Sequence, residues 1–200
     1  MGILLDSCRF VELCPEVVCS CKHFSCVRDA DIESFFKSEY ADYSSQLLGK
    51  SYAFVTSSVE DELVCAFTLS NSSISADRLT NNQRNRLNRS IPNAKRRRQY
   101  PAVLIGQLAV FDGFSGKRIG DELLDFIKAL TLDQEMKSAC RYLLVDAVNA
   151  VKVIDFYKRN GFKMLFASDA EESSYLGKSS DSTNKLKTRL MYFDLIQLKG

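Results

Sequence analysis

The segment Leu108–Gly120, which reads LAVFDGFSGKRIG, decides the fold of this 200-residue chain. It joins a continuous apolar stretch, Ala102–Phe111, to an amphipathic helix, and it holds three of the chain's nine glycines. A strand that enters a helix through a glycine-rich turn points free backbone N–H groups and the positive end of the helix dipole at one spot. Such a turn predicts a binding site for an anion such as a phosphate. The alternative is a tight turn that needs glycine only for its backbone angles.

The chain that follows this turn alternates helices and strands. Apolar residues recur at helical spacing from Ile119 to Leu130, which predicts a helix. The later pattern predicts a strand over Arg141–Ala147, a helix over Ala150–Arg159 that ends at Gly161, a strand over Phe162–Phe166, a polar loop over Ser168–Asn184 and a strand over Thr188–Leu195.

The chain that precedes the turn is less regular. It predicts an edge strand within Ile3–Val18 that breaks at Pro15, a helical region from an Asp29 or Asp31 cap to Gly49, and a hairpin of Ser51–Thr56 with Leu63–Leu69. Residues 71–100 are rich in Asn, Ser and Arg, and their pattern is compatible with a short helix near Thr80–Asn88. The apolar content of the whole segment is too thin for a buried element. Together these elements indicate an α/β protein in which helices flank a mixed sheet.

The composition is that of one folded domain. Hydrophobic residues make up 46% of the chain and charged residues 26%, which excludes a disordered protein. No apolar run approaches the roughly 18 to 20 residues that cross a bilayer. The Met1–Leu5 start also lacks the features of a signal peptide. We therefore expect a cytoplasmic protein without a membrane partner. The sequence is compatible with a homodimer.

Four of the seven cysteines lie close to the single histidine, His23, in one N-terminal stretch. These cysteines are Cys14, Cys19, Cys21 and Cys26. Structural zinc sites usually need a second pair of ligands further along the chain, and none follows here. We therefore expect reduced thiols and no metal.

Positive charge is concentrated in one segment. Residues 78–98 hold eight basic residues and no acid, whereas the rest of the chain has 19 basic against 25 acidic residues. The basic residues of this segment are Arg78, Arg84, Arg86, Arg89, Lys95, Arg96, Arg97 and Arg98. Such a local excess attracts an anionic partner, or it marks a solvated insertion at about residues 77–100 of a single domain.

A second motif narrows the family. The segment Asp146–Phe162 reads DAVNAVKVIDFYKRNGF, and its Phe156-Tyr157 and Asn160-Gly161-Phe162 resemble the signature of the GNAT acetyltransferase superfamily. The Leu108-Ala109-Val110 strand followed by Ile119-Gly120 is similar to the acetyl-CoA motif of the same family. The resemblance implies the GNAT fold, in which helices flank a central, mixed, mostly antiparallel sheet of six to seven strands.

The resemblance also implies which residues bind acetyl-CoA. The strand backbone at Leu108, Ala109 and Val110 would hold the pantetheine arm, and the turn Ser115, Gly116, Lys117, Arg118, Ile119 and Gly120 would hold the pyrophosphate. Asn149 and Phe156 match further positions of the cofactor site. Ser115 replaces the Gln or Arg of the family, and Arg118 replaces its first paired glycine, which puts the affinity for acetyl-CoA in doubt.

Tyr157 matches the general acid of the family. The resemblance implies direct attack of an amine on the thioester, after which Tyr157 protonates the departing thiolate. A phenol with a pKa of about 10 is protonated at neutral pH and can donate. The alternative is a core aromatic residue at helical spacing from Val153 and Ile154. No general base is evident among the candidates Glu39, Glu60, Glu62 and Asp112.

Several segments resemble one subgroup, the GNAT toxins of bacterial toxin-antitoxin pairs, which acetylate the amino acid on charged transfer RNA. These segments are Tyr100–Val110 (YPAVLIGQLAV), Phe24-Ser25-Cys26, Asp31–Phe36 and Phe67–Asn71. The basic segment Arg84–Arg98 would then contact tRNA phosphates. The acceptor could equally be the amine of a small molecule or a protein. A third alternative is a non-catalytic acyl-CoA-binding sensor.

Overall fold

The computed structural model describes residues 2–22, 24–27, 29–58, 60–89, 91–92, 98–133, 139–177 and 185–199. These residues fall into two compact units. The first comprises Met1–Asn71 with Ile105–Thr131, and the second comprises Ser72–Leu104 with Leu132–Gly200. The expectation of a single domain stays a prediction.

Hydrogen bonding orders seven strands as β1-β2-β3-β4-β5-β7-β6, and β3 and β4 contribute residues to both units. The strands are β1 (Cys8–Glu12), β2 (Lys50–Thr56), β3 (Leu63–Ser75), β4 (Gln99–Val110), β5 (Tyr142–Val148), β6 (Lys163–Met164) and β7 (Thr188–Asp194). The pairs β1–β2, β2–β3, β5–β7 and β6–β7 are antiparallel. The predicted mostly antiparallel sheet flanked by helices is confirmed.

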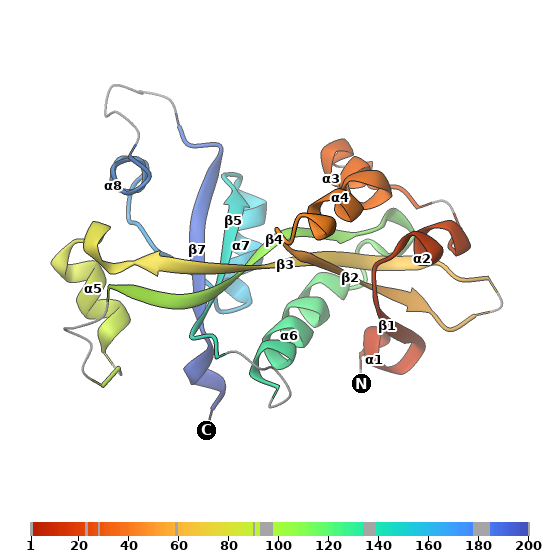
Figure 1. Cartoon of the computed structure of the whole chain (residues 1–200), viewed down its shortest axis with the longest axis horizontal. Coiled ribbons are helices and arrows are strands. Elements are labelled where there is room, and N and C mark those ends of the chain that lie inside the picture. The colour runs from red at the N-terminus through yellow and green to blue at the C-terminus, as the bar shows by residue number, and fades with distance from the viewer. Residues whose placement is uncertain are drawn as a thin grey trace. The chain divides into compact units, whose positions relative to one another are not determined.

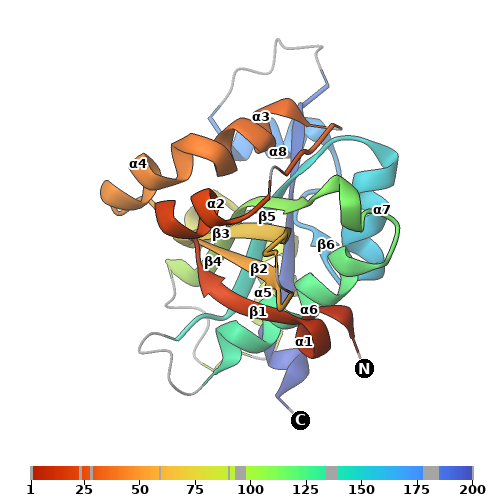
Figure 2. The same cartoon turned by 90° about the vertical axis from the view of Figure 1, so that its right-hand side faces the viewer.

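Helices cover both faces of the strands in the first unit. The helices are α1 (Ile3–Ser7), α2 (Pro15–Ser20), α3 (Ala30–Ser34), α4 (Tyr40–Ser45) and α6 (Ile119–Leu132), and a π-helical turn, Phe35–Glu39, joins α3 to α4. In Figures 1 and 2, α3 and α4 lie on one face of β2 and β3, whereas α1 and α6 lie on the other. Asp29 caps α3 by accepting a hydrogen bond from the Ile32 N–H, as the sequence predicts.

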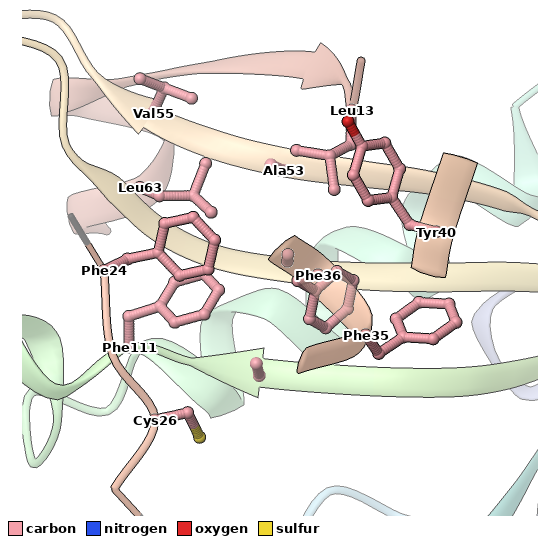
Figure 3. Close-up of a cluster of buried hydrophobic side chains, with 12 residues drawn as sticks. Leu13, Phe24, Cys26, Phe35, Phe36, Tyr40, Ala53, Val55, Leu63 and Phe111 are labelled. Carbon is pink, nitrogen blue, oxygen red and sulfur yellow. The ribbon is translucent and has the colours of Figure 1, made fainter. Parts of the chain in front are cut away.

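The core under α3 and α4 is built from aromatic side chains. Phe36 is fully buried and lies near Phe35 and Tyr40, and these rings share one cluster with Ala53 and Val55 of β2 (Figure 3). Phe24 and Phe111 complete the cluster with ring centroids 4.6 Å apart. Burying each such ring contributes about 1.5–3 kcal/mol. This packing fixes the end of β4, which Phe111 follows directly.

In the second unit, helices pack on the two faces of the β5–β7 pair. The helices are α5 (Asn81–Asn88), α7 (Val151–Arg159) and α8 (Asp169–Tyr175). Leu87 of α5 packs with Tyr142 and Tyr192. Residues next to these in the strands point to the opposite face. There Phe193 meets Phe162, which follows α7.

Four expectations from the sequence need correction or extension. The edge strand near the N-terminus is β1, but short helices flank it, and Pro15 begins α2 at a position where its missing N–H costs nothing. Residues 168–184 contain the helix α8, whose first turn is capped by the Ser168 hydroxyl. The helical region before β2 ends at Ser45, and Leu47 follows it at a φ of +58°, so Gly49 does not end the helix. Gly49 is instead needed because a Cβ would lie 2.5 Å from the Ser70 hydroxyl.

The expectation that residues 71–100 are too polar for a buried element is wrong. The predicted helix is present as α5, and Thr80 and Gln83 form a capping box at its start. Leu79, Leu87 and Tyr100 are at most 5% exposed and belong to the core of the second unit. This segment is therefore an integral part of that unit.

Candidate functional site

The predicted anion-binding turn begins at a firmly anchored point in the first unit. The Phe111 N–H donates to the Val64 carbonyl over 3.1 Å, and the Asp112 N–H donates to the Ser25 carbonyl over 3.0 Å. The Asp112 carboxylate accepts bonds from the Ser25 hydroxyl and the Val27 N–H, at 2.8 and 3.0 Å. These bonds fix where β4 ends and the turn starts.

The backbone of the turn presents a row of open donors. Gly116 has a φ of +79°, which lets the chain reverse before α6 begins at Ile119. None of the described residues accepts a hydrogen bond from the N–H groups of residues 116–120. The 14-residue helix α6 adds the positive end of its dipole at the same place. The arrangement suits an anion with several oxygen atoms, such as a pyrophosphate.

Arg118 departs from the family pattern in a physically informative way. Its φ is +61°, a left-handed conformation that glycine adopts at no steric cost. Arg118 therefore holds a backbone conformation that glycine would adopt without strain. The Arg118 side chain is 82% exposed and lies 3.3 Å from the Asp121 carboxylate.

The other predicted residues of this turn have packing roles as well. The Lys117 ammonium donates to the Gly113 carbonyl over 3.2 Å and lies 5.1 Å from the centre of the Phe114 ring. The Ser115 N–H donates to the Asp112 carbonyl. Ile119 is 1% exposed, so its side chain holds the start of α6 in the core while its N–H stays open. Gly120 follows it in the first turn of α6.

Side chains of the strand before the turn alternate between a buried and a partly exposed face, as binding of pantetheine along this strand would require. Ala109 is buried in the aromatic core of the first unit. Leu108 and Val110, its neighbours in β4, point to the other face and are partly exposed. An extended ligand could therefore reach this part of β4 on the face away from the core.

Asn149 follows β5 in the second unit, and its side chain is already engaged. Its amide donates to the Leu186 carbonyl over 2.8 Å and to the Asp169 carboxylate over 3.4 Å. Its backbone N–H donates to the Lys187 carbonyl over 2.9 Å. Asn149 therefore ties the start of β7 to the end of β5, a role that the sequence did not indicate.

Tyr157 lies on α7 with its ring buried. The ring is 9% exposed and contacts Phe156 and Phe162, with centroids 5.0 and 5.5 Å away. Burial raises the pKa of Tyr157 to about 12, which keeps the phenol protonated. No described residue forms a hydrogen bond with the hydroxyl, so it is free to donate to a ligand.

The end of α7 explains the Asn160-Gly161-Phe162 part of the signature. Gly161 has a φ of +84°, and a Cβ there would lie 2.8 Å from the Phe193 ring. The predicted glycine cap is confirmed. Phe156 is partly exposed, and the Arg159 guanidinium lies 5.1 Å from its ring centre. The signature thus shapes the helix that carries Tyr157.

The four carboxylates considered as general bases all have partners. Glu39 accepts from the Ser34 hydroxyl at 2.9 Å, and Glu60 and Glu62 both pair with Lys22. Asp112 is held as described above. Asp146 on β5 is a further candidate, which the sequence motifs do not indicate. Its side chain is exposed, yet the surrounding protein and the Glu172 carboxylate raise its pKa.

The basic segment is only partly available to a partner. Arg84 donates to the Asn81 side chain, and Arg86 donates to the Leu165 and Met164 carbonyls. Arg89 is exposed. Lys95, Arg96 and Arg97 lie outside the described residues.

The described residues show neither a metal centre nor a membrane span. They hold no cluster of three or more residues that could bind a metal ion, and all seven cysteines are free thiols. His23 lies outside them, so the Cys19, Cys21 and His23 arrangement is not described. No helix in the described part of the chain is long and apolar enough to span a membrane.

Comparison with known proteins places this arrangement among solved structures. No family model and no curated protein matches the chain. A KacT variant with one tyrosine replaced by phenylalanine superposes with a TM-score of 0.71 and 18% identity, covering 97% of this chain and 98% of that one. AtaT in complex with acetyl-methionyl-tRNA superposes with a TM-score of 0.70 and 15% identity, covering 96% of this chain and 97% of that one. AtaTR with bound acetyl-CoA gives 0.63 and 14%, covering 97% of each chain.

The chain has the GNAT fold. The fold implied by the two sequence motifs is thereby confirmed, and the similar structures include the toxins of toxin-antitoxin pairs. At 14–18% identity this likeness extends to the fold and not to the acceptor.

Proposed function

We propose that this chain is an acetyl-CoA-dependent N-acetyltransferase that acetylates the α-amino group of aminoacyl-tRNA. The observation that carries the proposal is the turn of residues 116–120, whose five N–H groups have no acceptor among the described residues. Several donors that converge at the start of a helix, with the positive end of the helix dipole, form a site that a phosphate can occupy. The likeness to AtaTR with bound acetyl-CoA supports the pyrophosphate as that ligand.

The proposed reaction needs no covalent enzyme intermediate. The acceptor nitrogen attacks the thioester carbonyl, the new C–N bond forms, and the C–S bond breaks with its electron pair on sulfur. Tyr157 gives its phenolic proton to that thiolate. A phenol is protonated at neutral pH even at its ordinary pKa of about 10, and the burial that raises the pKa of Tyr157 to about 12 keeps it protonated while making it a weaker acid. The turn and the exposed face of Leu108 and Val110 would hold the donor in place, so positioning contributes much of the rate.

The proposed acceptor is consistent with the lack of an unengaged general base among the four carboxylates first considered. The four carboxylates first considered as bases are engaged by other side chains or backbone groups. The α-amino group of an aminoacyl ester is already substantially neutral, so its deprotonation demands little of a base. Solvent or the exposed Asp146 would take the remaining proton. The similar structure of AtaT with acetyl-methionyl-tRNA supports this class of acceptor.

The proposal is tested by incubating the protein with labelled acetyl-CoA and a mixture of aminoacyl-tRNAs, followed by mass spectrometry of the released amino acids. N-acetylated amino acids from charged tRNA, and none from the same amino acids free in solution, are expected. Acetylation of only free amines or protein lysines would show that the acceptor is not aminoacyl-tRNA. Binding of acetyl-CoA without turnover on any amine would instead indicate a sensor module, for which the engaged amide of Asn149 is the favouring observation.

A further inference from the structure

The second unit contains a cavity that is lined by none of the residues assigned to catalysis or to acetyl-CoA. It has a volume of about 490 Å³ and is bounded by the end of α5, by β6 and by the end of β7. In the strand register Lys163 lies opposite Tyr192, and Tyr142 lies opposite Asp194. These four residues therefore form one continuous wall, which Arg86 and Arg89 of the α5 end complete.

The charge of this cavity is positive. Arg89 and Lys163 are exposed, and neither has an anionic partner among the described residues. The one carboxylate of the lining, Asp194, is held by the Arg141 guanidinium through contacts of 2.7 and 2.9 Å. Arg141 thus neutralises Asp194, and the cations of the cavity are left without a counter-charge.

Arg86 supplies a fixed cation in the same wall. Its guanidinium donates to the Leu165 carbonyl and, over 3.3 Å, to the Met164 carbonyl, and it lies 5.8 Å from the Tyr192 ring centre. A guanidinium held in this way is organised before a ligand arrives, so binding costs little side-chain entropy. Its remaining N–H groups can bond an oxyanion.

The floor of the cavity limits what can bind there. Tyr142 is fully buried, and its hydroxyl donates to the Leu87 carbonyl over 2.9 Å. Tyr192 is 4% exposed, and Arg86 covers its ring. No aromatic face is therefore open for a base to stack on, as sequence-tolerant binding of single strands requires. The cavity suits contacts to phosphate groups without reading of bases.

We propose that this cavity binds a phosphate of an RNA backbone through Arg86, Arg89 and Lys163. The identity of the ligand rests on the proposed function, because an aminoacyl-tRNA acceptor brings phosphates to the enzyme. The proposal also redistributes the predicted RNA contacts of the basic segment. Lys163 joins them from a strand far along the chain, whereas Arg84 is paired with Asn81 and does not. An acidic protein segment fits less well, because the apolar lining residues Leu87 and Tyr142 offer almost no surface to anchor it.

The test measures binding without turnover. Fluorescently labelled, uncharged tRNA is titrated with the protein at several salt concentrations, and its anisotropy is recorded. The double variant R89Q/K163Q removes the two unpaired cations and spares Arg86, which donates to the carbonyls of Met164 and Leu165. The control K152Q/K158Q removes two exposed cations of α7. Circular dichroism confirms that both are folded.

The wild-type affinity for tRNA is expected to fall steeply with salt. In R89Q/K163Q the log–log slope should fall by roughly one to two, about one for each lost phosphate contact, with affinity lower by about tenfold or more. The affinity of the control K152Q/K158Q for tRNA should lie within about twofold of the wild-type affinity. An unchanged slope in R89Q/K163Q, or an equal loss in the control, would overturn the site.

Two competitors separate the ligand classes. Adenosine monophosphate that binds in an Arg89- and Lys163-dependent manner, while tRNA binding ignores these residues, would assign the cavity to free nucleotides and overturn the RNA contact. A hepta-glutamate peptide with the same behaviour would assign it to an acidic protein segment. The assay uses no acetyl-CoA, so the cavity can be confirmed even where acetyl transfer fails. Conversely, if the protein acetylates aminoacyl-tRNA but the salt slope of R89Q/K163Q is unchanged, only the assignment of the cavity is wrong.

Discussion

The turn of residues 116–120 and the end of β5 at Asn149 differ in how they use their polar groups. In the turn, five backbone N–H groups have no acceptor among the described residues, and Arg118 holds a left-handed backbone conformation. At the end of β5, the Asn149 amide is used by the Leu186 carbonyl. Backbone N–H groups are present whatever the side chain, so a binding site built from them tolerates substitutions. A site that depends on one side chain is lost when that side chain bonds to another part of the protein.

The largest expected effect comes from closing the turn. Replacing Gly120 by Asp places a carboxylate at the open N–H groups, where it competes with and repels the pyrophosphate. Affinity for acetyl-CoA should fall on the order of 100-fold or more, measured by calorimetry.

A matched control for this variant adds the same charge elsewhere on α6. Ala129 is exposed near the end of that helix, so Ala129→Asp should leave acetyl-CoA affinity within about twofold. Wild-type affinity in a folded Gly120→Asp variant would remove the turn as the pyrophosphate site.

The next effect concerns Tyr157. The change to Phe keeps the buried ring and removes only the proton donor, so turnover should fall roughly 10- to 1000-fold with little change in acetyl-CoA affinity. Because the pKa of Tyr157 is raised to about 12, its donation should persist to pH 10, where an unperturbed tyrosine is half ionised. Tyr52→Phe is the control. Parallel losses of stability and activity in Tyr157→Phe would make Tyr157 a packing residue.

Asn149→Ala tests the other side of the comparison. The lost hydrogen bond leaves the Leu186 carbonyl without its donor, so the free energy of unfolding should fall by about 1–2 kcal/mol in urea. Asn85→Ala, at an exposed position of α5, should change it by less than about 0.5 kcal/mol. Weaker acetyl-CoA binding at unchanged stability would mean that Asn149 serves the ligand and not the fold.

The smallest effect is expected at Arg118. Glycine there relieves the left-handed backbone, whose cost of about 1–2 kcal/mol is partly offset by the greater freedom of glycine in the unfolded chain. A gain of about 0.5–1 kcal/mol in unfolding free energy is expected, since the exposed Asp121 pair contributes little. Leu47→Gly, at a φ of +58°, should give a similar gain without affecting acetyl-CoA. Destabilisation by Arg118→Gly would contradict the strain argument.

Most elements of the fold could be predicted from local sequence patterns. The helices α6 and α7 and the strands β5 and β7 have strong periodicity, and the turn before α6 has glycines where the backbone requires them. The helix α8 was missed because its residues are mainly polar and its position depends on contacts such as that between the Glu172 carboxylate and the buried Arg189.

Long-range contacts explain what the sequence did not show. Leu87 lies in a polar segment, and its burial follows from Tyr142, 55 residues away, whose hydroxyl binds its carbonyl. Asn149 finds its partner at Leu186, 37 residues away. A motif could therefore indicate the position of Asn149 but not its hydrogen bonds. The open N–H groups of the turn were predictable because they depend only on the local chain.

The most direct test of the central claim observes the turn itself. Backbone amide resonances of the isotope-labelled protein are recorded during titration with acetyl-CoA and, separately, with acetyl-pantetheine, which lacks the pyrophosphate. We expect large shifts for the amides of residues 116–120 with acetyl-CoA and small shifts with acetyl-pantetheine. Binding of acetyl-CoA that leaves these five amides unshifted would contradict that claim.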